Sequence, residues 1–349
     1  MLFGIAGFEL RYQLRNPVFW VAVAIFFLLG FGLTASENVG IGGGGAVHEN
    51  APFAIALALG IFCLFYQFVT TSFVANAIIR DEATGFGPIV RATSVIKTDF
   101  VLGRFLGGLG IALLGYLAVP AGMAMGVMMP WVDPETVGPN GPGRYAWHFL
   151  IIAVPNIVFS SAFLLTLATT FRSMMATYIG VIIFLMGYTI TTVILSNAPE
   201  QLPVFAKFEL LGIAAMQEAA RYWTTAELNS RMVPLEGNLL INRLFILGLS
   251  VVFIGFTLWR YSMADRPASK RQVRKMAKTE AAEAKAAATI PLLTGGTGRP
   301  VYDAAATRAQ LGVRLRTEIM QVLKSPGLIV ILLLAMFNAL GELWTGRTM

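Results

Sequence analysis

Residues 53–79 read FAIALALGIFCLFYQFVTTSFVANAII, and this stretch contains no Asp, Glu, Lys or Arg. A helix needs about 20 mostly apolar residues to cross the hydrocarbon core of a bilayer. A soluble domain cannot hide such a run, because its surface has to carry enough polar groups to face water. The stretch therefore predicts a membrane-spanning helix.

Further apolar stretches repeat this pattern along the chain. Hydrophobic residues make up 56% of the sequence and charged residues 13%, whereas soluble domains carry about 25% charged residues. The further candidate spans are 18–35, 101–129, 147–170, 174–196, 239–260 and a short seventh at 328–344. The sequence thus predicts an all-α membrane protein built as a six-helix transmembrane bundle. Arg104 and Arg243 lie near span ends, where we expect them to snorkel towards water.

The distribution of Lys and Arg predicts the orientation. Segments 1–17 and 80–104 together hold six basic residues, whereas 36–52 and 130–148 together hold one. Loops on the cytoplasmic side carry the excess of Lys and Arg, and the early helices usually set the topology. We therefore expect a multi-pass protein of the inner membrane with a cytoplasmic N-terminus. A cleaved signal peptide is disfavoured, because the first apolar stretch exceeds the usual h-region of about 7–15 residues.

A polar segment precedes the first span. It runs from Glu9 through Arg11 and Arg15 to Pro17. Such a segment predicts an amphipathic elbow helix in the membrane interface, with its basic residues near lipid phosphates. Pro17 is expected in the first turn of the next helix, where its missing N–H costs little.

A similar segment, 318–326, precedes the seventh span, also with Glu and Pro eight residues apart. Duplicated transporter halves show this kind of internal symmetry, although any interfacial helix before a span could look alike. The repeat predicts a six-span half over 1–260, a cytoplasmic linker over 261–309, and a second elbow with a first span over 310–349. The chain would then be a fragment of a longer protein.

The segments outside the spans differ in character. We expect a short helix at about 207–223 and a flexible turn at Gly42–Gly45. In the long polar segment, 269–288 is rich in Ala, Lys, Glu and Arg and predicts an exposed helix. A further helix is expected at about 302–323.

Enzyme motifs are scarce. The sequence has no Gly-x-x-x-x-Gly-Lys-Ser/Thr and no His-Glu-x-x-His, so neither ATP hydrolysis nor zinc hydrolase chemistry is expected of this chain. Its histidines are His48 and His148, and its single cysteine, Cys63, lies in an apolar run. An intramembrane serine enzyme would need His148 and Ser160 at one depth, which their separation disfavours. We expect no cofactor, no metal and no nucleic acid.

Polar and small residues inside the spans indicate helix packing. The amides Gln67, Asn76 and Asn156 are expected to hydrogen-bond between helices. Glycines spaced by four residues permit close approach of helices. These pairs are Gly103 with Gly107, and Gly122 with Gly126.

The first predicted cytoplasmic loop combines acids with bases. It reads Arg80-Asp81-Glu82-Ala83-Thr84-Gly85, and Arg91 and Lys97 follow. An ordinary topogenic loop remains possible on composition, but topology needs only the basic residues.

In order along the chain, these segments resemble the membrane subunit of an ABC transporter of the type-2 exporter family. The matching segments are Arg15-Asn16-Pro17, Arg80-Asp81-Glu82-x-x-Gly85, Gly103-Arg104 and the turn Phe171-Arg172-Ser173. A narrower likeness is to the N-terminal half of a subfamily whose long members carry an M1-type aminopeptidase domain at the C-terminus. It rests on Arg221-Tyr222-Trp223-Thr224, Glu227-x-Asn229-Ser230-Arg231 and Asn242-Arg243.

The resemblance implies that a separate ABC ATPase, the nucleotide-binding subunit, hydrolyses ATP. That subunit would dock on residues 80–99, with Glu82 and Gly85 at the best-matched positions, while the elbow 8–17 would slide in the interface. A second permease half or a homodimer partner is also implied, with spans one, two and five along the shared pathway. The alternative is a non-transporting scaffold that anchors a peptidase or signalling partner through 197–238. The sequence does not indicate the substrate.

Overall fold

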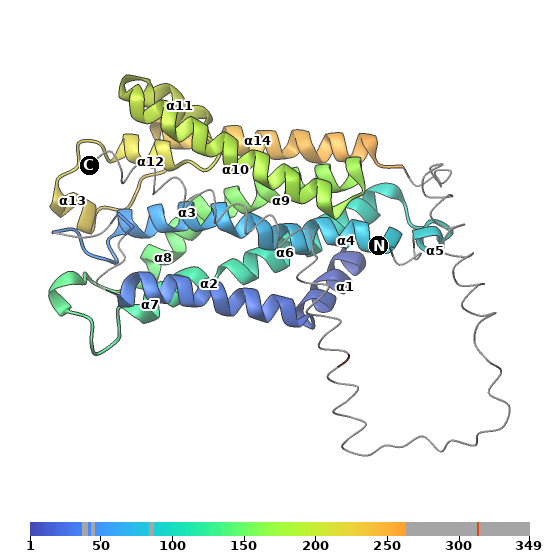
Figure 1. The fold of residues 1–349 in the computed structure, drawn as a ribbon, viewed down its shortest axis with the longest axis horizontal. Coiled ribbons are helices and arrows are strands. Elements are labelled where there is room, and N and C mark those ends of the chain that lie inside the picture. The colour runs from blue at the N-terminus through green and yellow to red at the C-terminus, as the bar shows by residue number, and fades with distance from the viewer. Residues whose placement is uncertain (37–40, 43–45, 84–86, 263–312, 314–349) are drawn as a thin grey trace, which may run out of the picture. The chain divides into compact units, whose positions relative to one another are not determined.

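The computed structural model of the protein describes residues 1–36, 41–42, 46–83, 87–262 and 313 (Figure 1). Within these residues the chain is all α-helical, with no β-strand. Six helical spans are long and apolar enough to cross a membrane: Pro17–Ala35, Pro52–Asp81, Lys97–Gly126, Pro142–Phe171, Met174–Leu195 and Gly237–Arg260. The predicted all-α six-helix bundle is confirmed, and the chain is a multi-pass membrane protein.

Several predictions concern residues outside the described part of the chain. They are the seventh span at 328–344, the second elbow at 318–326, the helices at 269–288 and 302–323, and nearly all of the linker 261–309.

The spans are assembled from shorter elements. Span one is α2 (Pro17–Ala35), and span two joins α3 (Pro52–Thr70), η1 (Thr71–Ala75) and α4 (Asn76–Ala83). Span three joins α6 (Lys97–Tyr116) and α7 (Ala118–Gly126), and span four joins α8 (Pro142–His148), η3 (Phe149–Ala153) and α9 (Val154–Phe171). Spans five and six are α10 (Met174–Asn197) and α14 (Gly237–Arg260).

Shorter helices lie outside the spans. They are α1 (Leu2–Leu14), α5 (Gly87–Arg91), η2 (Pro134–Thr136), η4 (Pro199–Gln201), α11 (Leu202–Phe208), α12 (Ile213–Ala219) and α13 (Thr225–Ser230). The end of the bundle that carries α1, α4 and α5 is called the elbow end below, and the opposite end is called the loop end (Figure 1).

The chain turns sharply between α1 and α2. Asn16 caps α2, because its Oδ1 accepts a hydrogen bond from the Val18 amide at 3.0 Å, and Pro17 is in the first turn as predicted. The indole Nε1 of Trp20 donates to the Leu14 carbonyl at 3.0 Å and braces the turn. A helix, α1, is therefore present where the elbow was predicted, and its position in the membrane interface stays a prediction.

Glycines seat two helices closely on span three. A Cβ built on Gly103 would lie 2.8 Å from the Cβ of Ile5, and one on Gly107 would lie 2.6 Å from the Cβ of Glu9. Further along span three, a Cβ on Gly122 would meet the Phe27 carbonyl, and one on Gly126 would meet the Phe31 carbonyl at 2.7 Å. Both predicted glycine pairs are confirmed as packing sites, the first for α1 and the second for α2.

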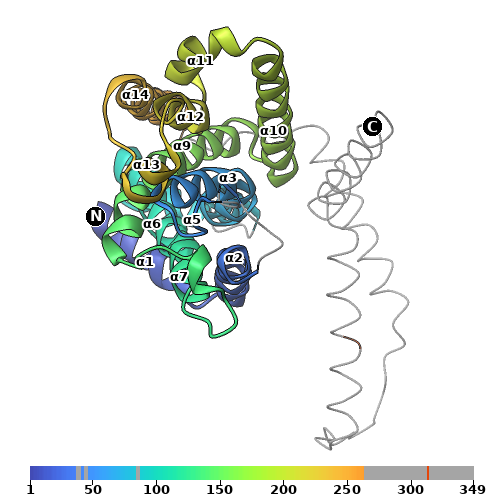
Figure 2. The same cartoon turned by 90° about the vertical axis from the view of Figure 1, so that its left-hand side faces the viewer.

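Spans two and four form the inner part of the bundle. Pro142–Phe171 is the most buried of the six spans and Met174–Leu195 the least. Figure 2, which looks along the spans, shows α3 and α9 inside, with α2, α10 and α14 at the periphery. At the centre, Tyr66 and Tyr116 stack edge to face at 4.8 Å and donate to the carbonyls of Ala112 and Leu59.

Both inner spans contain a π-helical segment, η1 in span two and η3 in span four. A π turn shifts the backbone hydrogen bonds by one residue, and nearby hydroxyls can satisfy the carbonyls that are released. Around η1 the hydroxyls of Thr70, Thr71 and Ser72 donate to the carbonyls four residues earlier. The amide prediction holds for Asn156, which bonds across helices, but neither amide atom of the buried Gln67 side chain has a hydrogen-bond partner among the described residues.

Two predictions for the loops have opposite outcomes. The predicted helix at 207–223 is wrong as one element, because α11 and α12 are separated at Glu209–Gly212. Gly212 has φ +77, a left-handed conformation that glycine adopts without a side-chain clash. Between spans four and five the predicted short turn is present: Arg172 has φ 48, and the Ser173 Oγ accepts from the Ala176 amide to cap α10.

Candidate functional site

A buried carboxylate at the elbow end gathers charged groups from three distant parts of the chain. Glu9, on α1, is fully buried. Its Oε2 accepts from the Arg80 Nη2 at 2.9 Å and also from the Arg104 Nη1. Its Oε1 accepts from the Gln13 Nε2, one turn further along α1, at 2.9 Å. Glu9 is thereby joined to the end of span two and the start of span three.

Asp81 is the second acid of this group. The Arg104 Nη2 donates to the Asp81 Oδ2 at 2.6 Å, so that Arg104 bridges the two carboxylates. The Arg80 Nε lies 4.0 Å from the Asp81 Oδ1. We call Glu9, Arg80, Asp81 and Arg104 the elbow ion-pair cluster. It holds two acids and two bases, which balances the formal charge.

Helix geometry places each member of the cluster. Gly107 lets α1 approach span three so closely that Glu9 lies against the span. Arg104 precedes Gly107 by about one helical turn and therefore points to the same side of α6. Arg80 and Asp81 lie in α4, whose contacts include both α6 and α9. The cluster thus forms because the glycine that lets α1 approach span three lies one helical turn from Arg104.

Aromatic rings cover the guanidinium groups. The Arg80 guanidinium carbon lies 4.1 Å from the centroid of the Tyr12 ring. The Arg104 guanidinium carbon lies 5.9 Å from the Phe8 ring and 5.5 Å from the Phe100 ring. Cations attracted to ring faces gain about 0.5–1 kcal/mol at exposed sites and more when they are desolvated. Phe8 and Tyr12 therefore hold α1 to the cluster in addition to Glu9.

The cluster fixes the relative positions of α1, α4 and α6. Removing one partner from a buried ion pair typically costs about 3–5 kcal/mol, because an uncompensated charge remains buried. A shift of α1 away from Gly107 would separate Glu9 from both arginines at once. The three elements are therefore expected to move together.

The segment between α4 and α6 packs on the bundle near the cluster. Val90, at the end of α5, and Val95 pack against an apolar group that includes Val74, Phe100 and Tyr261. Phe100 and Tyr261 stack with ring centroids 5.8 Å apart. Residues of the segment 80–99, on which the ATPase is predicted to dock, therefore rest on the start of span three and on the end of span six.

The residues predicted for docking and for the elbow lie in different places, and their predicted roles stay predictions. Arg80, Asp81 and Glu9 meet in the cluster. Arg11 and Arg15 are exposed on the other face of α1. Lys97 begins α6, Glu82 lies in α4 and Arg91 ends α5. Gly85 is outside the described residues.

Arg104 is the member that sequence reasoning missed. The prediction that it snorkels is wrong, because it is only 5% exposed and pairs with two carboxylates. The available signal was the presence of acids at Glu9 and Asp81, which positive-inside topology does not require.

A second buried arginine, Arg243, lies at the loop end. The prediction that its side chain snorkels towards water is also wrong. Arg243 is 3% exposed. Its Nη1 donates to the Asn156 Oδ1 at 3.0 Å and its Nη2 to the Asn242 Oδ1 at 2.5 Å. A Cβ on Gly212 would overlap the guanidinium. We call Asn156, Asn242 and Arg243, together with Glu209, the loop-end polar cluster.

Glu209 connects this cluster to the segment between α11 and α12. Its carboxylate accepts from the amides of Leu211 at 2.7 Å and Ala214 at 3.3 Å. Burial raises the pKa of Glu209, and the opposing effects of these amide donors and of Arg243 do not cancel that increase. The Asn242 Nδ2 donates to the carbonyls of Ala206 and Glu209 at 2.9 and 2.7 Å. The cluster therefore locks α11 and α12 onto α14.

The loops at this end are tied to one another. Asn50 and Gly138 exchange two hydrogen bonds of 2.9 and 2.7 Å. The Asn229 Oδ1 accepts from the His48 amide at 2.8 Å. The His148 Nδ1 donates to the Arg144 carbonyl, and its Nε2 accepts from the Val233 amide. No group of three or more His, Cys, Asp or Glu residues in the described part of the chain could hold a metal ion.

No protein-family model matches the chain, and no curated protein is detectably similar to it. The elbow ion-pair cluster is the candidate functional site on its geometry alone.

Proposed function

We propose that the chain is the membrane-spanning permease half of an ATP-driven ABC exporter of the type-2 family. In this proposal the elbow end faces the cytoplasm of a bacterial cell and the six spans cross the inner membrane. A separate ABC ATPase docks on the segment 80–99 and supplies the energy. The observation that carries the proposal is the elbow ion-pair cluster, in which Arg104 joins Glu9 to Asp81.

The cluster supports a mechanical role. A membrane anchor needs apolar spans, but it does not need charged groups buried between an interfacial helix and the ends of two spans. Such groups are expensive to bury, and inside membrane segments they mark functional sites. Because Arg80 and Asp81 immediately precede the loop, a force on that loop would reach α1 and α6 through the ion pairs.

The peripheral spans leave room for a second half. On α2 the side chains of Val21, Ile25 and Leu28 are exposed, and on α10 those of Ile183 and Ile190 are exposed. Lipid could cover these faces. In the proposal a second permease half or a second copy covers part of them, in line with the role that the resemblance implies for spans one and five; span two lies in the inner part of the bundle.

The docking role is tested by charge reversal. The full chain is co-purified with a candidate ABC ATPase, with and without Glu82→Lys. We expect weaker association and reduced stimulation of ATP hydrolysis. Glu200→Lys, at the exposed Glu200 of the loop end, is the matched control and should behave as wild type. Unchanged association and stimulation in Glu82→Lys would refute the docking site.

The mechanical role is tested separately with Glu9→Gln. This variant keeps the docking segment intact and weakens the ion pairs to Arg80 and Arg104. We expect normal association with the ATPase but reduced stimulation of ATP hydrolysis. If the wild-type chain binds its partner without altering ATP hydrolysis, the scaffold function is favoured instead.

A further inference from the structure

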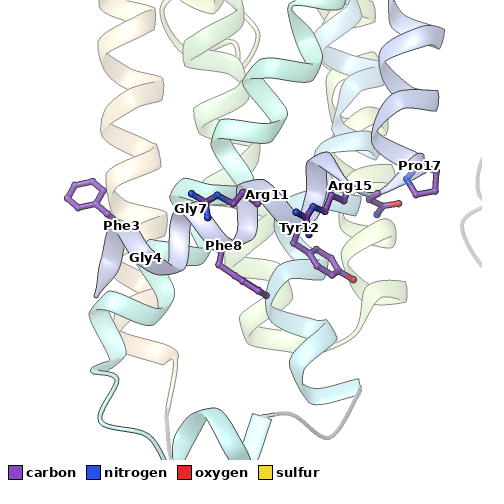
Figure 3. Close-up of a pocket in the computed structure, with 9 residues that line it drawn as sticks. Phe3, Gly4, Gly7, Phe8, Arg11, Tyr12, Arg15 and Pro17 are labelled. Atoms are coloured by element: carbon purple, nitrogen blue, oxygen red, sulfur yellow. The ribbon is translucent and has the colours of Figure 1, made fainter.

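The outer face of α1 carries a hollow of about 780 Å³ (Figure 3). Small-molecule sites commonly have volumes of about 300–1,000 Å³. Its lining includes the polar side chains of Arg11, Arg15 and Asn16 and the aromatic side chains of Phe3, Phe8 and Tyr12. Figure 3 shows Phe8 and Tyr12 extending to one side of α1, with Arg11 and Arg15 placed along the helix. The hollow thus combines two cationic groups with an apolar surface.

The two faces of α1 differ in whether nearby acids balance the arginines. The inner face packs against Arg80 of α4 and Arg104 of α6. On the inner face Arg80 and Arg104 are balanced by Glu9 and Asp81. On the outer face Arg11 and Arg15 have no acidic partner among the described residues. Helical spacing puts Arg11 and Arg15 one turn apart on one side, so both can approach one anion. The outer face therefore has unbalanced positive charge.

The position of α1 along the bundle selects the kind of anion. Span one begins at Pro17, only two residues after Arg15. A helix of 19 residues at about 1.5 Å per residue nearly matches a hydrocarbon core of about 30 Å. α1 therefore lies at the depth of the lipid headgroups. The exposed indole of Trp20 nearby fits this interfacial depth.

We propose that the hollow on α1 binds the headgroup of an anionic phospholipid. Arg11 and Arg15 contact the phosphate, and exposed Phe3 and Phe8 lie against the adjoining acyl chains. Phe8 and Tyr12 also cover Arg104 and Arg80, so a bound lipid touches the side chains that hold the elbow ion-pair cluster. The proposal does not depend on transport activity, since it needs only the membrane and α1.

Native mass spectrometry of the full chain in neutral detergent tests the proposal. Phosphatidylglycerol and phosphatidylcholine with the same acyl chains are added in turn, and the lipid retained per chain is compared. We expect a clear preference for phosphatidylglycerol. Each basic group near an anionic surface contributes about a fivefold change in affinity, so Arg11→Gln with Arg15→Gln should lower the preference roughly 25-fold.

Matched variants separate a headgroup site from general attraction. Arg172→Gln with Arg260→Gln removes the same charge from the elbow end and should leave the preference intact. Arg11→Lys with Arg15→Lys keeps the charge, guards against misfolding of the glutamine variant, and should retain part of the preference. An equal loss in the Arg172 and Arg260 variant, or no loss in the Arg11 and Arg15 variant, overturns the proposal.

Inorganic phosphate distinguishes a lipid from a free anion. An excess of phosphate at constant ionic strength should leave phosphatidylglycerol bound, because the acyl chains add apolar contacts that phosphate lacks. Full displacement by inorganic phosphate would show that the hollow binds the free anion and would overturn the lipid assignment.

Discussion

The two ends of the bundle each bury an arginine, but they compensate it differently. At the elbow end Arg104 meets two carboxylates from two other segments. At the loop end Arg243 meets the amide oxygens of Asn156 and Asn242, and the acid of this cluster, Glu209, is held by backbone amides. The first arrangement ties helices together through charge. The second holds a folded loop through hydrogen bonds from a cation to neutral amide oxygens, so its loss should be less damaging.

The largest effect is expected from Arg104→Met. This change leaves Glu9 and Asp81 buried with only Arg80 to balance them, which should lower the free energy of unfolding by about 3–5 kcal/mol. Thermal unfolding in detergent measures the loss. Arg15→Met, the same change at an exposed site, is the control. Adding Glu9→Gln to Arg104→Met should recover part of the stability, and a further loss would contradict the ion-pair account.

Arg243→Met should have a smaller effect. It leaves the neutral oxygens of Asn156 and Asn242 without their donor, at about 1–3 kcal/mol. The same unfolding measurement is used, beside Arg104→Met. If Arg243→Met were the more damaging of the two, the contrast between charged and neutral compensation would be wrong.

The aromatic rings over the elbow ion-pair cluster should contribute less to the free energy of unfolding than either buried arginine. Tyr12→Leu removes the ring 4.1 Å from the Arg80 guanidinium while keeping apolar bulk, and about 0.5–1 kcal/mol should be lost. Tyr222→Leu is the matched control, because Tyr222 is 85% exposed and its ring centroid lies 5.6 Å from Arg221. Equal midpoints of thermal unfolding for the two variants would show that the Tyr12 ring does not stabilise the elbow ion-pair cluster.

The smallest effect is expected from Glu209→Gln, and it should appear as a change with pH. The pKa of Glu209 is raised in the folded state, so its contribution to stability is fully present below the unfolded pKa. That contribution is lost as the pH rises through the folded pKa. The midpoint of thermal unfolding should therefore fall with rising pH more in wild type than in Glu209→Gln. Parallel curves would show that burial does not raise this pKa.

The sequence predicted the spans because each long apolar run carries its own signal. The same holds for the elbow, where Pro17 marks the start of span one, and for the glycine pairs. Burial of Arg104 and Arg243 was not predicted, because it depends on Glu9, Asp81 and Asn156, which lie far away in sequence. Local periodicity contains no information about such partners.

The break between α11 and α12 was missed for a related reason. Gly212 alone gives only a weak signal, and its left-handed conformation is needed because Arg243 occupies the space where a side chain would be. The sequence alone therefore indicated the charged segment that holds Arg80 and Asp81. The contacts of Glu9 and Arg104 between helices could be found only in the structure.

The glycine seats on span three also bear on how the chain enters the membrane. Span one is the most apolar of the six spans, and span three, which receives both α1 and α2 on its glycines, is the least. Span one is synthesised before span three and has to remain in lipid without that partner, for which high apolarity suffices. Span three emerges when its neighbours are already in place, so a less apolar, glycine-rich helix can be retained by contact. Of these two spans, the one that is synthesised first is thus the more apolar.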